Sequence, residues 1–153
     1  MTQNPQTEKN TEKASKNKTE LDLYLIDQEL LGSIIAIIAY IILIVSSQQS
    51  RKVLLQGQMK TSNGNSNNDT NLNPTELALI SSWLSLLSII ILAQVAFRRL
   101  SELQAQVESG GSHIPLTPNI YITTGFIFSI VANIIKVIGA QQRYALQRPV
   151  TIL

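Results

Sequence analysis

Three long apolar blocks separated by polar segments dominate the pattern of the chain. They are Leu30–Ser47, Leu77–Phe97 and Ile120–Ala140. The first two contain no charged residue, and Lys136 interrupts only the third. A hydrocarbon core about 30 Å thick needs roughly 20 apolar residues in a helix, with about 17 to 25 tolerated. The pattern therefore predicts an all-α integral membrane protein with three transmembrane helices, at about 30–47, 77–97 and 120–140.

A soluble helical bundle is the alternative interpretation of such blocks. A helix on the surface of a soluble protein shows a polar face every 3.6 residues. In Ile34–Val45 only Tyr40 is even partly polar. The absence of a polar face favours lipid, rather than a protein core, as the surroundings of these helices.

Capping residues place the helix ends beyond the apolar blocks. Asn73-Pro74-Thr75-Glu76 has the pattern of an N-cap, a proline at the first helical position and an early acid. Thr117-Pro118 repeats it, and Gly57 and Gly110 are suitable stops. We expect helices near 20–56, 74–108 and 118–147. The second would be about 50 Å long and would extend beyond the bilayer.

Polar linkers divide the chain around this membrane domain. Residues 1–19 contain few apolar side chains and are predicted to be a disordered tail. Residues 20–147 form the three-helix domain, 61–73 an Asn/Ser-rich flexible loop, and 148–153 a short tail. Because nearly thirty hydrophilic residues precede the first span and no A-x-A site follows it, we expect a permanent anchor rather than a cleaved signal.

The first and third spans resemble each other in sequence. Residues 34–49 and 127–142 align without a gap, with identical Ile, Ala and Gln residues at seven positions. In a three-span protein these two helices run in the same direction, so a repeat about an axis along the membrane normal is geometrically allowed. The two interpretations are a true repeat, in which aligned small residues pack equivalently, and the chance likeness of two Ile-rich helices.

Small and polar residues within the spans are candidates for helix contacts. Helices in lipid associate through close packing and interhelical hydrogen bonds, so their interfaces favour such residues. The candidates are Gly125, Ser129, Ala132, Asn133, Gly139 and Ala140 in the third span, Ser81, Ser85 and Ser88 in the second, and Ala36 and Ala39 in the first. They predict either a close-packed three-helix bundle or a polar path between helices or subunits. Asn133 is expected to hydrogen-bond to a neighbouring helix.

Lys136 and Trp83 are assigned to the membrane boundary. An ionisable residue within a span is a functional hypothesis by default. Lys136 lies about four residues from the end of its span, however, so its long stem can reach the interface by snorkelling. Trp83 is assigned to the same kind of environment.

Composition argues against most catalytic chemistry. The chain has 44% hydrophobic and 14% charged residues, no cysteine and one histidine. His113 stands alone in a turn-forming stretch. Asp22, Asp27 and Glu29 are spaced so that they could bind a cation, although the surrounding pattern favours the solvated face of an interfacial helix. We predict no enzyme activity, no cofactor and no metal site, and a net charge of +2 gives no reason to expect nucleic-acid binding.

The leading functional hypothesis is a structural or accessory membrane subunit that acts through helix packing. Its partners are the lipid bilayer and either further copies of itself or another membrane protein. The alternatives are an oligomeric pore former, which resembles holins only in size and number of spans, and a component of a small transporter. We expect the protein to lie in the cell membrane. The basic residues near the spans slightly favour an orientation with the N-terminus outside and the C-terminus in the cytoplasm.

Overall fold

The computed structural model describes residues 5–59, 73–110 and 115–147, all within or beside three long helices. They are α1 (Pro5–Met59), α2 (Pro74–Glu108) and α3 (Thr117–Gln147). Each is long and apolar enough to cross a membrane. The predicted all-helical fold with three candidate spans is therefore confirmed.

The capping pattern sets the ends of α2 as predicted. The Asn73 side chain accepts a hydrogen bond from the Thr75 N–H at 3.0 Å, and Pro74 occupies the first helical position. At the other end Gly110 has a φ of +73°, and its N–H donates to the Val107 carbonyl at 3.0 Å. Glycine adopts this left-handed conformation at little cost, so α2 ends there.

The first helix begins earlier than the sequence predicts, at Pro5 rather than near residue 20. Residues 5–19 include four Lys and two Glu, which are good helix formers. Extending an existing helix avoids the cost of a new nucleus, so the long apolar helix carries this polar segment with it. Most of the 61–73 loop and the 148–153 tail lie outside the described residues, as does His113.

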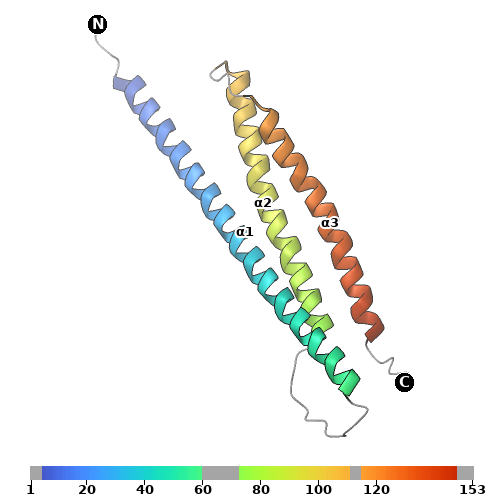
Figure 1. The fold of residues 1–153 in the computed structure, drawn as a ribbon. Helices are drawn as coiled ribbons and strands as arrows, with labels where there is room; N and C mark the ends of the chain where they lie inside the picture. The colour runs from blue at the N-terminus through green and yellow to red at the C-terminus, as the bar shows by residue number, and fades with distance from the viewer. Residues whose placement is uncertain (1–4, 60–72, 111–114, 148–153) are drawn as a thin grey trace, which may run out of the picture.

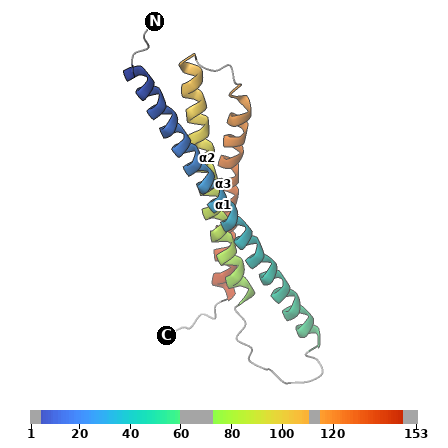
Figure 2. The same cartoon turned by 90° about the vertical axis from the view of Figure 1, so that its left-hand side faces the viewer.

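The helices form an open arrangement with α2 in the middle (Figure 1). α1 and α3 each pack against α2, and no contact pairs α1 with α3 in the described ranges. A view from the side shows α1 crossing the other two helices obliquely (Figure 2). Within the described helices, α1 and α3 thus contact α2 separately and do not form the close-packed three-helix bundle that the small residues predict.

Most apolar side chains point away from the other helices. Less than a third of the residues in each apolar stretch are buried within the chain. Phe128 and Ile135 on α3, for example, are 71% and 65% exposed. Exposed apolar surface on this scale is unfavourable in water but suits contact with lipid chains.

Candidate helix contacts and membrane-boundary sites

Three serine hydroxyls connect α1 to α2 through hydrogen bonds to backbone carbonyls. Ser46 Oγ donates to Pro74 O at 2.6 Å, Ser81 Oγ to Ala39 O at 2.8 Å and Ser88 Oγ to Gly32 O at 2.8 Å. On both helices these positions recur every seven residues, so the bonds follow one antiparallel line. We call these six residues the serine seam.

Small side chains let the two backbones approach along the serine seam. Ala39 is 0% exposed and Ser81 is 1% exposed. A Cβ added to Gly32 would lie 3.0 Å from Cγ and Cδ2 of Leu92. A serine hydroxyl reaches a carbonyl on the neighbouring helix only when the backbones are this close, so small size and hydrogen bonding depend on each other.

The predicted contact residues of α1 and α2 differ in how deeply they are buried. Ala39, Ser81 and Ser88 are buried in the serine seam, whereas Ala36 and Ser85 are half-buried beside it. The predicted set omits Ser46. The signal that could have found it is the matched seven-residue spacing of 32, 39 and 46 against 74, 81 and 88, which appears only when the two helices are compared in antiparallel register.

The face of α3 that packs on α2 differs from the predicted stripe. Its buried residues are Thr123 and Val137. Of the predicted residues, Ser129, Asn133 and Ala140 are half-buried, while Gly125, Ala132 and Gly139 are exposed. A Cβ added at Gly125 or Gly139 would meet nothing within 4 Å. We call Gly125, Ala132 and Gly139 the free face of α3.

The prediction for Asn133 requires correction. Its Nδ2 donates to the Ser129 carbonyl at 2.9 Å, within α3, and Ser129 Oγ in turn donates to the Gly125 carbonyl at 2.8 Å. A carbonyl four residues earlier is always within reach of such a side chain on a helix, and it satisfies the polar group without a neighbour.

The sequence likeness between the first and third spans relates the free face of α3 to the serine seam. In the ungapped alignment, extended by two residues, Gly125, Ala132 and Gly139 correspond to Gly32, Ala39 and Ser46. Those three residues are the α1 side of the serine seam. The same helix face is therefore made of small residues in both spans, but only in α1 does it have a partner within the chain.

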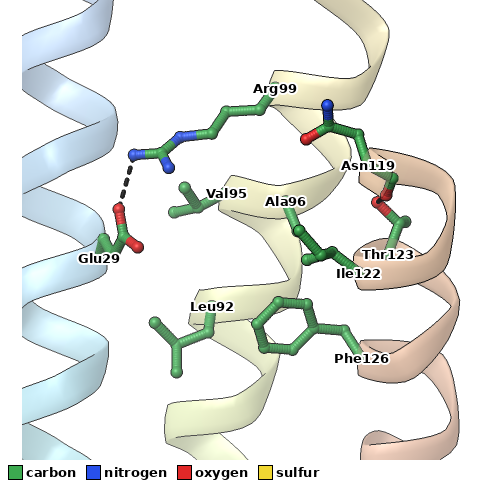
Figure 3. Close-up of a pocket in the computed structure, with 9 residues that line it drawn as sticks. All are labelled: Glu29, Leu92, Val95, Ala96, Arg99, Asn119, Ile122, Thr123 and Phe126. Carbon is green, nitrogen blue, oxygen red and sulfur yellow. Dashed lines mark hydrogen bonds and ion pairs between the residues drawn. The ribbon is translucent and has the colours of Figure 1, made fainter. Parts of the chain in front are cut away.

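At the end of the molecule near the α1 apolar boundary, an ion pair joins α1 to α2 beside a cavity that α3 also lines (Figure 3). Arg99 of α2 forms a 2.6 Å ion pair with Glu29 of α1. The pair lies at a cavity of about 230 Å³ that also includes Asn119 and Phe126 of α3. The two side chains are 43% and 48% exposed, so the ion pair contributes at most about 1 kcal/mol.

The remaining predicted groups lie at the surface. Trp83 is 49% exposed on α2, and Lys136 is exposed on α3 beside a second cavity. Asp22 and Asp27 are exposed on α1. In the described residues no cluster of three His, Cys, Asp or Glu side chains could hold a metal ion.

No family model, curated protein or solved structure matches the chain. The functional argument therefore depends on the helix contacts themselves.

Proposed function

We propose that this small multi-pass membrane protein is a non-enzymatic structural or accessory subunit, and that the free face of α3 binds a transmembrane helix outside this chain. The observation that carries the proposal is the contrast between two equivalent faces. Gly32, Ala39 and Ser46 are covered by α2, whereas Gly125, Ala132 and Gly139 are uncovered.

The physical basis is the behaviour of small residues in lipid. Lipid chains are as apolar as leucine, so nothing expels a large apolar side chain from them, and helix association depends on close packing. A row of small residues leaves a shallow channel in which another backbone can approach. The serine seam shows this kind of contact between α1 and α2.

The non-enzymatic part of the proposal rests on composition. With no cysteine and one histidine, the chain lacks a thiol nucleophile and has a single imidazole for acid–base chemistry. The buried serines Ser46, Ser81 and Ser88 all donate to backbone carbonyls. These hydroxyls support helix packing and are not poised as nucleophiles.

Substitutions on α3 test the proposal. Ala132→Leu and Gly125→Leu fill the channel without touching α2, so they should abolish association and leave the fold of the single chain intact. Ile134→Leu changes an exposed, apolar position on the same helix and is the control. Association is measured by disulfide formation in native membranes through one cysteine at the other position, Gly125→Cys for the Ala132→Leu variant and Ala132→Cys for the Gly125→Leu variant. The readout is unambiguous because the chain has no other cysteine.

The partner is identified by the same experiment. A disulfide-linked dimer of the Ala132→Cys variant indicates a second copy, and a heterologous adduct that Gly125→Leu prevents indicates another membrane protein. Equal association of the Leu variants and the control would refute the proposal. Leakage of dye from vesicles that contain the parent, but not from those with Ala132→Leu, would replace it with an oligomeric pore former.

A further inference from the structure

A second cavity, of about 310 Å³, opens between α2 and α3 at the end opposite to the Glu29–Arg99 pair. The walls are formed by Thr75, Ala78 and Ser82 of α2 and by Lys136, Gly139 and Arg143 of α3, with Leu43 of α1 at one side. The cavity is thus bounded by small and apolar residues, two hydroxyls and two cations.

The charges at this cavity are unbalanced. No acidic side chain is among its walls, and Glu76, the nearest acid along α2, does not line it. Neither Lys136 nor Arg143 forms an ion pair with any described residue. The two are seven residues apart, so they lie on one face of α3 about 10 Å apart along its axis. The Cα–Cβ bond of Arg143 tilts toward the start of the helix, which directs its side chain toward the cavity.

The hydroxyls in the walls already have acceptors. Ser82 Oγ donates to the Ala78 carbonyl at 2.8 Å, and Thr75 Oγ1 donates to Oε1 of Gln147. The ammonium of Lys136 and the guanidinium of Arg143 are therefore the donors that remain for a ligand. Together they favour a group with a negative charge and several acceptor oxygens, such as a phosphate.

The position of the cavity in the membrane identifies the source of that phosphate. Lys136 lies inside the third apolar block and Arg143 just beyond it, so the cavity crosses the boundary between lipid chains and headgroups. A lysine in a span is costly when unpaired. Basic pockets between transmembrane helices bind anionic lipid headgroups, chiefly on the cytoplasmic side. The C-terminal end of α3 is the end predicted to face the cytoplasm.

We propose that the cavity lined by Lys136 and Arg143 binds the phosphate of an anionic phospholipid, with the acyl chains along the apolar surfaces of Leu43 and Ala78. Lys136 then has a partner in the bound lipid and does not depend on snorkelling alone.

Quenching of the single tryptophan measures the binding. Trp83 adjoins Ser82 in sequence and is half exposed. The full chain is reconstituted in vesicles in which brominated phosphatidylglycerol or brominated phosphatidylcholine replaces the unlabelled lipid. Two cations that contact one bound headgroup, each contributing about 1 kcal/mol, should give about a thirtyfold preference for phosphatidylglycerol at the cavity, which charges without a headgroup contact do not supply.

Two double variants distinguish a site from general surface charge. Lys136→Gln with Arg143→Gln should reduce the preference to near one. Arg51→Gln with Lys52→Gln removes the same charge from the same end of the molecule, outside the cavity, and should change the preference less than threefold. Equal losses in the two variants, or no preference in the parent, would overturn the proposal.

Two further measurements test the shape of the site and the nature of its ligand. Ala78→Leu fills the cavity from the α2 side while keeping both cations and leaving the free face of α3 unchanged, and it should abolish the preference. Retention of the preference in a folded Ala78→Leu variant places the lipid elsewhere and overturns the proposal. If inorganic phosphate, compared with chloride at equal ionic strength, removes the preference, then the ligand is the free ion and not a lipid. Should Ala78→Leu fail to fold, the two double variants decide the outcome.

Discussion

Replacing Ala39 by leucine should separate α1 from α2. It should lower the free energy of unfolding more than removing every hydroxyl of the serine seam does. Ala39 is fully buried and its carbonyl accepts the hydrogen bond from Ser81. The three extra carbons have no space between the two backbones. Overpacking of this kind costs about 1–3 kcal/mol.

The hydrogen bonds contribute the second part of the expected loss of stability. An interhelical hydrogen bond in a membrane protein contributes about 0.6 kcal/mol on average. Removing all three hydroxyls by Ser46→Ala, Ser81→Ala and Ser88→Ala should therefore cost about 2 kcal/mol, with the helices still close. Ala39→Leu loses the same bonds by separation and adds the overpacking, so the total is about 3–5 kcal/mol.

Energy transfer from Trp83 measures the separation of the two helices. The chain has one tryptophan and no cysteine, so a dye on Tyr40→Cys, which is 61% exposed on α1, is the single acceptor. Unfolding is followed in detergent micelles as the fraction of dodecyl sulfate increases. Ile37→Phe adds bulk at a 59% exposed position of the same helix and should change stability by no more than about 0.5 kcal/mol.

The ranking of the variants by loss of stability tests this account of the serine seam. If the triple alanine variant loses more stability than Ala39→Leu, then hydrogen bonds and not close approach hold the seam. If neither variant differs from Ile37→Phe, then α1 and α2 do not pack as described.

Three further outcomes follow from the other contacts. Arg99→Gln should lower stability by no more than about 1 kcal/mol, measured by the same titration, because both partners of its ion pair are nearly half exposed; a loss of 3 kcal/mol would mean that the pair is buried in the membrane. Ser62→Cys and Ser109→Cys should react with a membrane-impermeant reagent from opposite sides, and labelling from one side would contradict three spans. A reporter fused after Leu153 should be active in its cytoplasmic form, and activity only outside the cytoplasm would reverse the predicted orientation.

The sequence predicts the helices well because each signal is local. Twenty uncharged residues, an Asn-Pro pair and a glycine suffice to define α2 without reference to the rest of the chain. The start of α1 was missed because the polar segment before Glu20 gains its helical order from the helix that follows it. Composition alone cannot report that dependence.

The faces that meet are harder to predict, since they depend on relative rotation and register. Small residues occupy more than one face of each span, so composition names Ala39, Ser81 and Ser88 together with Ala36 and Ser85, and only the register between α1 and α2 separates them. In α3 small residues occupy both the face on α2 and the free face. Ala140 and Gly139 differ by one position, which is a rotation of about 100°, and only packing decides between them.

The length of α1 has a consequence for what the protein meets in water. Between Pro5 and Glu29 the helix rises about 36 Å along its axis, and Glu29 stands at the edge of the apolar block. Electrostatic screening at physiological ionic strength acts over about 8 Å. The first turns of α1 thus lie several screening lengths away from the lipid headgroups. The electric field that a soluble molecule meets at this projecting end is therefore set by the charges of the helix itself and not by the lipid composition beneath it.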